Sequence, residues 1–173
     1  MLSADGGVVH EGLANFNNDG VVPDVIPVAP KDILGVTYSD DVKADFGNEL
    51  TPTQVKDQPN VTWDAMPDTL YTLIVSDPDA PSRENPIRRE FLHWLVVNIP
   101  GHKMDEGDID FTVTSSRSSS SPGNMTAKIE ARPNFNTVVF AEQHKLSLIA
   151  GNFFQAKYDD HVPNVHKKLA EEK

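Results

Sequence analysis

Two nearly continuous apolar runs constrain the fold of this chain more than any other feature. They are LYTLIVS at residues 70–76 and FLHWLVVNI at residues 91–99. Each ends at a strong turn signal, Asp-Pro-Asp after the first run and Pro-Gly after the second. Runs without a polar face are typical of strands covered on both sides, so we expect two central β-strands. The long segment between them is expected to be an ordered loop, which is a usual place for a binding site.

The remaining elements are expected to be shorter. Strands are predicted at residues 33–38, 61–64 and 150–158, because these segments combine β-branched or aromatic residues with flanking turns. In residues 135–146 the positions of Phe135, Val138, Val139 and Leu146 predict a short amphipathic helix with these side chains in the core. Pro163 fits the first turn of a terminal helix. The fold class expected is mainly β, an antiparallel β-sandwich-like single domain with short helices near the C-terminus.

The N-terminal part of the chain lacks such patterns. Residues 1–20 are rich in Gly, Asn and Asp and predict a flexible lead-in. Residues 21–30 contain three prolines, which exclude a regular helix there. With 173 residues, the chain is long enough for one domain with a real core, predicted here over residues 21–173.

The charge and the missing cysteines exclude several classes of function. There are 15 Lys and Arg against 26 Asp and Glu, a formal charge of −11. An acidic chain does not suit the phosphate backbone of a nucleic acid, nor general attraction to an anionic membrane. Without cysteine there is no thiolate catalysis and no cysteine-based zinc site. A local anion site stays compatible with these numbers, because net charge does not fix the potential in one cleft.

Membrane and targeting signals are not visible in the sequence. No apolar run approaches the roughly 18 residues that a transmembrane helix needs. The first 20 residues contain neither a basic n-region nor an apolar h-region of a signal peptide. We therefore expect no transmembrane segment and a cytoplasmic location.

The best candidate for chemistry is the segment Asp77-Pro-Asp-Ala-Pro-Ser-Arg83 together with His93. Two prolines stiffen the loop and hold its polar side chains in place at low entropic cost. If the two strands are neighbours, Asp77 at the end of one meets His93 on the other. A protonated His93 beside an acceptor suits phosphate or another oxyanion, with weak and pH-dependent affinity. The alternative is an ordinary Asp-Pro-Asp turn and a core histidine, which this spacing alone favours.

Other constellations are weaker. Asp159-Asp160-His161 contains metal-ligand types, but adjacent strand residues point to opposite faces. A serine hydrolase is disfavoured because there is no Gly-x-Ser-x-Gly and the serine tract offers no geometry that activates a hydroxyl. The arginines at 83, 88 and 89 with Glu84 and Glu90 are interpreted as a solvated surface network. We expect no metal, no cofactor and no enzymatic activity.

Five segments together resemble the phosphatidylethanolamine-binding protein family, which includes the Raf kinase inhibitor proteins. They are LTPTQVKD at 50–57, VTWD at 61–64, LYTLIVSDPDAPSR at 70–83, REFLHWLVVNIPG at 89–101 and GNFFQAKYDDHVP at 151–163. The resemblance implies a β-sandwich-like fold on a large antiparallel sheet, with a small anion pocket. By position it implies ligand-binding roles for Asp77, Pro81, Phe91 and His93, and loop-shaping roles for Asp79 and Arg83.

The function implied is non-enzymatic binding of a phospholipid headgroup or another phosphate-like anion. A regulatory role as an inhibitor of a kinase or a serine protease accompanies it, so a kinase or protease is an expected partner. The second signature of the family, a Gly/Pro-rich stretch ending in Gly-x-His-Arg-Tyr, has no counterpart between Asp108 and Glu130. Divergence, alternative splicing and an error in the gene prediction would each leave such a gap.

A Ser-rich segment at 111–124 stands in its place as an insert or replacement. A pocket wall and at least one central strand are therefore expected to be missing. Losing that strand would expose sheet edges, which favours association. The alternative function is a protein-interaction module whose anion pocket is defunct.

Overall fold

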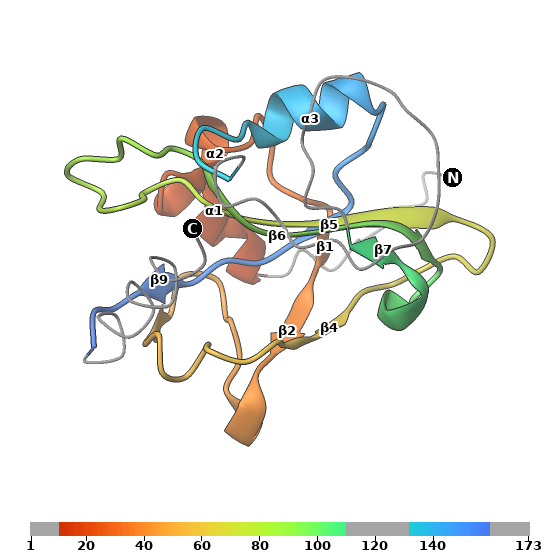
Figure 1. Cartoon of the computed structure of the whole chain (residues 1–173), viewed down its shortest axis with the longest axis horizontal. Coiled ribbons are helices and arrows are strands. Elements are labelled where there is room, and N and C mark those ends of the chain that lie inside the picture. Colours follow the sequence, from red (N-terminus) through yellow and green to blue (C-terminus); the bar gives the residue numbers. More distant parts are fainter. Residues whose placement is uncertain (1–10, 110–131, 160–173) are drawn as a thin grey trace, which may run out of the picture. The chain divides into compact units, whose positions relative to one another are not determined.

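The computed structural model describes residues 11–109 and 132–159 (Figure 1). The chain divides into two compact units, which are described separately. The first contains residues 1–63 and 148–173, and the second contains residues 64–147.

The first unit is built from short helical turns and three two-stranded sheets. Its helices are η1 (Glu11–Ala14), α1 (Asn15–Asn18), α2 (Val21–Asp24) and η2 (Ser39–Asp41). Its strands are β1 (Asp32–Ile33), β2 (Gly35–Thr37), β3 (Glu49–Leu50), β4 (Asn60–Thr62), β8 (Ala150–Gly151) and β9 (Gln155–Ala156). Strands β1 and β8 are parallel, as are β3 and β9, whereas β2 and β4 are antiparallel.

Aromatic packing and one asparagine hold this unit together. The Phe16 ring is only 3% exposed and lies edge-on to Phe153 and Phe46, with centroids 5.0 and 6.3 Å away. The Asn152 amide donates to the Leu34 and Ala44 carbonyls, 2.9 and 3.0 Å away. Residues 11–18 are thus fixed by Phe16, in contrast to the flexible lead-in expected over 1–20. Residues 1–10 lie outside the described part.

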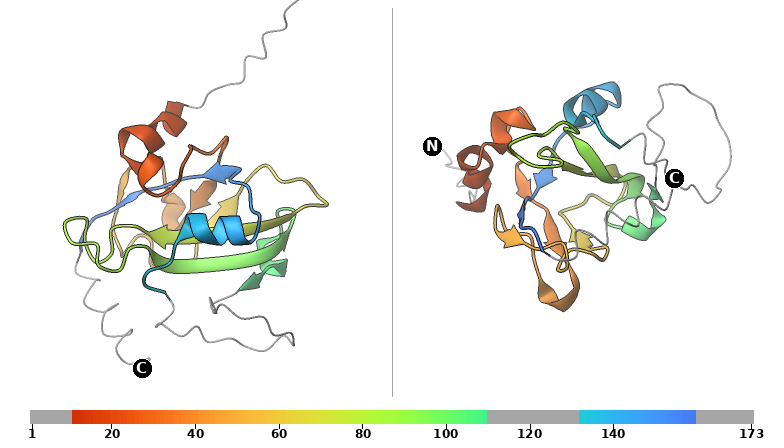
Figure 2. Two further views of the ribbon diagram at one scale, coloured as in Figure 1. Left: turned by 90° about the horizontal axis from the view of Figure 1, so that it is seen from above. Right: turned by 60° about the vertical axis from the view of Figure 1, so that its left-hand side comes forward.

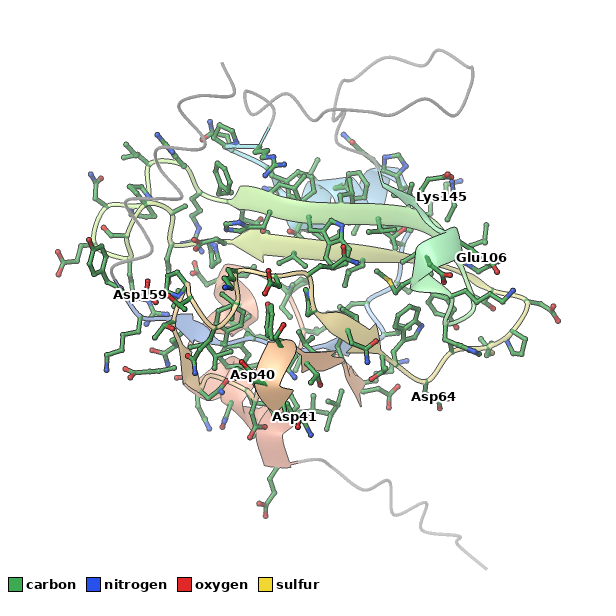
Figure 3. The ribbon with its side chains drawn as sticks, turned by 60° about the horizontal axis from the view of Figure 1, so that its bottom comes forward. Asp40, Asp41, Asp64, Glu106, Lys145 and Asp159 are labelled. Atoms are coloured by element: carbon green, nitrogen blue, oxygen red, sulfur yellow. The ribbon has the colours of Figure 1, made fainter. Side chains whose placement is uncertain are left out.

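The second unit contains the two strands that the apolar runs predict. They are β5 (Leu70–Asp77) and β6 (Phe91–Pro100), which form an antiparallel hairpin. The short strand β7 (Asp108–Ile109) pairs with the other side of β6, after the 3-10 turn η3 (Met104–Glu106). Figure 3 shows Glu106 of η3 at one end of the hairpin, and the loop between β5 and β6 lies at the other end.

Strand β6 contains two bulges and is buried on both faces. Val75 pairs with Trp94 and Ser76 pairs with Leu92, so His93 is an extra residue in β6. A second shift lies opposite Tyr71 to Leu73, where Asn98 has a φ of +56°. Neighbouring strand residues point to opposite faces, so the adjacent buried residues at 91–92 and 95–96 show that β6 is covered on both sides as predicted.

The helix α3 (Thr137–Gln143) covers one face of the hairpin (Figure 2). Its preceding residue Phe135 packs with Leu92 and Leu95, and Phe140 joins this cluster. The predicted helical face over 135–146 is wrong in two respects. Asn136 caps the helix through Val139 N–H, so Phe135 precedes it, and Val139 is 44% exposed. The cap sets the helix register so that Phe140, not Val139, faces the core.

The predicted fold class is confirmed as mainly β with few and short helices. Two of the five strand pairings in the described residues are parallel, so the antiparallel prediction holds for the β5–β6–β7 sheet and the β2–β4 pair only. The strand predicted over 33–38 is split into β1 and β2, and the one over 150–158 into β8 and β9. The sandwich layering stays a prediction. The Ser-rich segment 111–124, the lost central strand and the helix from Pro163 lie outside the described residues.

Candidate functional site

Asp77 and His93 are neighbours at the end of the β5–β6 hairpin where the connecting loop begins and ends. The Nε2 atom of His93 lies 3.8 Å from Oδ2 of Asp77, which is an ion-pair distance and too long for a hydrogen bond. Both side chains are accessible, with exposed fractions of 53% for His93 and 40% for Asp77. Asp77 pairs with Phe91 in the strand register, so His93, two residues further along β6, is its diagonal neighbour. The two groups thus present a carboxylate and an imidazole side by side to solvent.

The environment of Asp77 favours its ionised form. Burial raises the pKa of Asp77, but the His93 imidazole and the Asp79 backbone N–H outweigh burial and lower it below the ordinary 3.8. The Asp79 N–H donates to Oδ1 of Asp77 over 2.8 Å. One carboxylate oxygen is therefore held by the backbone, and the other one faces His93.

The loop after Asp77 is closed by its own hydrogen bonds. The Arg83 Nε donates to Oδ2 of Asp79 at 3.0 Å, and the Arg88 N–H donates to the Ala80 carbonyl at 3.0 Å. Pro81 is exposed at the start of this loop and follows the buried Ala80. Asp79 and Arg83 thus form an ion pair within the loop, and because Arg83 is 69% exposed, this pair adds little stability.

Phe91 is the apolar neighbour of this polar pair. It faces Asp77 in the strand register, and its ring lies 5.2 Å from the His93 ring at an angle of 61°. With 9% exposure, Phe91 supports His93 from the core side. Asp77, Phe91 and His93 come together in one place, while Pro81 lies in the adjoining loop.

Glu90 is a site-forming residue that the sequence interpretation missed. We expected it in a solvated network with arginines, but it is only 7% exposed. Its carboxylate accepts hydrogen bonds from the Ser76 hydroxyl at 2.7 Å, from the Thr137 N–H at 3.0 Å and from the Thr137 hydroxyl. A carboxylate beside an apolar run is a weak signal for burial, and its donors come from distant parts of the sequence.

This network ties together three segments at the loop end of the hairpin. Ser76 precedes Asp77, Glu90 precedes Phe91, and Thr137 begins α3. The backbones of Glu90 and Phe135 also exchange two hydrogen bonds, of 3.1 and 2.9 Å. A buried carboxylate with several donors is a rigid anchor, so Glu90 fixes the strand ends that carry Asp77 and His93.

Two further findings bear on the alternative sites. Asp40 and Asp41 lie side by side on η2 (Figure 3), but across residues 11–109 and 132–159 no group of three or more His, Asp or Glu could hold a metal ion. The Asp159-Asp160-His161 candidate falls largely outside the described residues. In the same described ranges, none of the helices has the length and apolarity needed to cross a membrane.

Comparisons with known proteins identify the family of this chain. The family model described as "Phosphatidylethanolamine-binding protein" matches residues 39–133. The "Putative odorant-binding protein A5" of Drosophila melanogaster is 32% identical over 86% of this chain and 81% of its own length. The "26 kDa secreted antigen" of Toxocara canis is 35% identical over 82% of this chain, which spans only 63% of that relative.

Solved structures show the same fold. The solution structure of CG7054 is 38% identical, with a TM-score of 0.58 over 86% of this chain and 97% of that one. A carboxypeptidase Y inhibitor, solved in complex with its cognate proteinase, is 22% identical with a TM-score of 0.67 over 86% and 95%. The phosphatidylethanolamine-binding protein of Plasmodium vivax is 16% identical with a TM-score of 0.60 over 85% and 97%. The chain therefore belongs to the phosphatidylethanolamine-binding protein family.

Proposed function

We propose that this protein binds a phospholipid headgroup, or another phosphate-like anion, without catalysing a reaction. The observation that carries the proposal is the accessible Asp77–His93 pair, with 3.8 Å between Oδ2 and Nε2. A protonated imidazole donates to a phosphate oxygen, and the carboxylate stabilises its positive charge. The same carboxylate suits the ammonium group of ethanolamine. Membership of a family described as phosphatidylethanolamine-binding supports this choice of ligand.

The ligand site proposed here consists of Asp77, Pro81, Phe91 and His93. Phe91 supplies an apolar wall, and Pro81 borders the loop that Asp79 and Arg83 shape. The second signature of the family is missing from the sequence, so this is a half-site. With fewer donors for the phosphate, we expect weak binding, and pH-dependent binding if the imidazole must be charged.

A titration with phosphorylethanolamine tests this proposal. Heteronuclear NMR of the full chain should show saturable shifts at His93 and Asp77, larger for phosphorylethanolamine than for inorganic phosphate. Equal binding by the wild type and by His93→Ala, or no binding by either, would contradict the headgroup proposal. Turnover of generic esters that is abolished by Asp77→Asn would contradict the proposed absence of enzymatic activity.

A regulatory role is proposed for the same protein, as an inhibitor of a kinase or a serine protease. One structural neighbour is an inhibitor seen with its proteinase, which supports a protein partner of this kind. Inhibition of a serine carboxypeptidase by the purified chain is the direct assay for the protease role, and a panel of purified kinases serves for the other. We also propose a cytoplasmic location, which imaging of the tagged full chain tests.

The second candidate is a protein-interaction module with a defunct anion pocket. The missing second signature favours it, because a site without half of its residues loses ligand affinity. The two candidates differ in one prediction. If the pocket is defunct, His93→Ala and Asp77→Asn leave binding of the protein partner intact. If regulation uses the pocket, the same substitutions abolish binding of the partner.

A further inference from the structure

The end of the hairpin opposite the Asp77–His93 pair carries exposed apolar side chains. Met66 is 66% exposed, and Leu70, the first residue of β5, is 65% exposed. Pro67 lies between them in the chain and is exposed too. Single exposed apolar side chains are ordinary on a protein surface, but three within five residues make a small apolar patch, and such patches mark contact sites. We call these three residues the 66–70 patch.

Hydrogen bonds hold the 66–70 patch in one conformation. The Thr69 N–H donates to the Met66 carbonyl at 3.2 Å, which closes a turn with Pro67 at its second position. The Met66 N–H donates to the Tyr71 hydroxyl at 2.8 Å. A turn of this kind brings its first and fourth residues within about 7 Å of each other, so the two ends of the patch are neighbours. Binding to this preformed turn has little ordering cost for the backbone.

The two connections at this end of the hairpin are acidic. Residues 64–69 precede β5 and residues 101–107 follow β6. Their charged side chains are Asp64, Asp68, Lys103, Asp105 and Glu106. Four carboxylates against one ammonium group give 1 − 4 = −3 over 13 residues, whereas the whole chain carries −11 over 173 residues. Negative charge is therefore concentrated beside the patch, and Glu106 already neutralises Lys103 at 2.7 Å.

The two acidic connections lie against each other. The Gly101 N–H donates to the Thr69 carbonyl at 2.9 Å, and a Cβ placed on Gly101 would lie 3.5 Å from the Pro67 carbonyl oxygen. Figure 3 shows Asp64 and Glu106 at the same end of the hairpin, with Lys145 also toward this end. Adding the charge of Lys145 still leaves a net −2, so the patch has an acidic border.

This border selects the kind of partner. A second copy of the chain carries the same −11 and is repelled, and so is an anionic membrane. A folded partner would need about 800 Å² on each side, which three side chains do not supply. A short segment that combines lysine or arginine with an aliphatic or aromatic side chain matches the carboxylates and the apolar contact together.

We propose that the 66–70 patch binds a short basic segment of another protein. An apolar side chain of that segment packs on the patch, and its lysines or arginines contact the carboxylates of Asp64 and Asp68. The flexible thioether of Met66 adapts to the shape of the inserted side chain. This inference is independent of the proposed headgroup function, because the patch and the Asp77–His93 pair lie at opposite ends of the hairpin and can be occupied together.

An NMR titration of the full chain with synthetic peptides tests the proposal. The probe is a capped hexapeptide of alternating lysine and leucine. Two comparison peptides replace every lysine by glutamate or every leucine by serine. The wild type should bind the probe saturably, with shifts at Met66 and Leu70, and the affinity should decrease as the salt concentration is raised from about 50 to 300 mM. Each comparison peptide should bind about fivefold more weakly or less, because it lacks one of the two contacts.

Variants of exposed residues locate the contact on the protein. Met66→Gln should lower the affinity for the probe about threefold, since it removes apolar contact. The double variant Asp64→Asn, Asp68→Asn should lower it by about as much and weaken its dependence on salt. Ile87→Gln is the matched control, because Ile87 is 68% exposed at the other end of the hairpin and should bind the probe as the wild type does. Thermal melts confirm that each variant is folded.

The outcomes separate this inference from its alternatives. Equal affinities of Met66→Gln and Ile87→Gln for the probe, equal binding of the glutamate or serine peptide, or no saturable binding would overturn it. A wild-type dimer, or binding to anionic vesicles, that Met66→Gln abolishes would assign the patch to a second copy or to a membrane and overturn it as well. His93→Ala should bind the probe like the wild type, so a failure of phosphorylethanolamine binding overturns the headgroup site alone.

Discussion

The imidazole of His93 lies 3.8 Å from the carboxylate of Asp77, which pairs with Phe91 two residues before His93 in β6. Residues two apart in a strand share a face, so Phe91 and His93 are both neighbours of Asp77 across the hairpin. The pairing of β5 with β6 therefore brings the two polar side chains together in an otherwise apolar hairpin.

The first prediction concerns the ionisation of Asp77. Its pKa is lowered because the His93 imidazole and the Asp79 N–H outweigh the effect of burial. A carbon-detected NMR titration should find the Asp77 carboxyl below 3.8, and His93→Ala should raise its pKa. A wild-type value above 3.8, or an unchanged value in His93→Ala, would contradict the electrostatic coupling.

The second prediction is the pH dependence of stability at this site. A carboxyl whose folded pKa lies below its unfolded value of 3.8 stabilises the fold above that pH. This contribution is lost as the pH falls through the folded pKa. Asp77→Asn should therefore have a slightly lower Tm than the wild type at pH 6 and the same Tm in strong acid.

The effect is small because Asp77 is 40% exposed and solvent screens its interactions. Glu84→Gln, in the exposed part of the same loop, is the control and should lack this dependence. A Tm difference for Asp77→Asn that persists unchanged to the lowest pH would contradict the linkage.

The third prediction concerns Glu90. Glu90→Ala leaves the Ser76 hydroxyl and both Thr137 donors without their acceptor in a buried place, and should destabilise the fold by about 3 kcal/mol. Urea unfolding measures this loss. Glu90→Gln, which keeps one acceptor oxygen, should lose less, and the exposed Glu84→Ala should change stability by less than about 0.5 kcal/mol. Similar losses of unfolding free energy for Glu84→Ala and Glu90→Ala would show that the hydrogen bonds of Glu90 do not stabilise the fold.

The fourth prediction separates general destabilisation from the positioning of the site. Asn136→Ala removes the cap of α3 and should cost about 1 kcal/mol. Ser76→Ala removes a donor to Glu90 and should cost a similar amount. Only Ser76→Ala should weaken phosphorylethanolamine binding, because Ser76 is next to Asp77. If both variants weaken phosphorylethanolamine binding equally, the hydrogen bonds of Glu90 do not position the Asp77–His93 pair.

The central hairpin could be predicted from the sequence because its signals are local. The runs 70–76 and 91–99 became β5 and β6 with nearly the same ends, since apolar composition and terminal turns decide both. The contact between Asp77 and His93 was also predicted, on the condition that these two strands are adjacent in the sheet. Phe16 was missed, because a single aromatic in a Gly- and Asn-rich segment has no periodicity to indicate its burial.

Other features depend on contacts between distant residues and had no local signal. The burial of Glu90 requires Thr137, which comes 47 positions later in the chain. The register of α3 depends on which residue caps it, and Asn136 moved Val139 to the surface. The parallel pairings β1–β8 and β3–β9 join the two chain segments of the first unit, which are about 100 residues apart in the sequence. The periodicity of one segment contains no information on such a distant partner.

The most direct measurement of the central claim is phosphorylethanolamine affinity by calorimetry or NMR, compared in three proteins at pH 6. The wild type and His102→Ala, which removes an exposed imidazole after β6, should bind alike and saturably. His93→Ala should bind at least tenfold more weakly, because the phosphate loses its charged donor. Equal affinities in all three proteins, or no binding by the wild type, would contradict the assignment of Asp77 and His93 as a headgroup site.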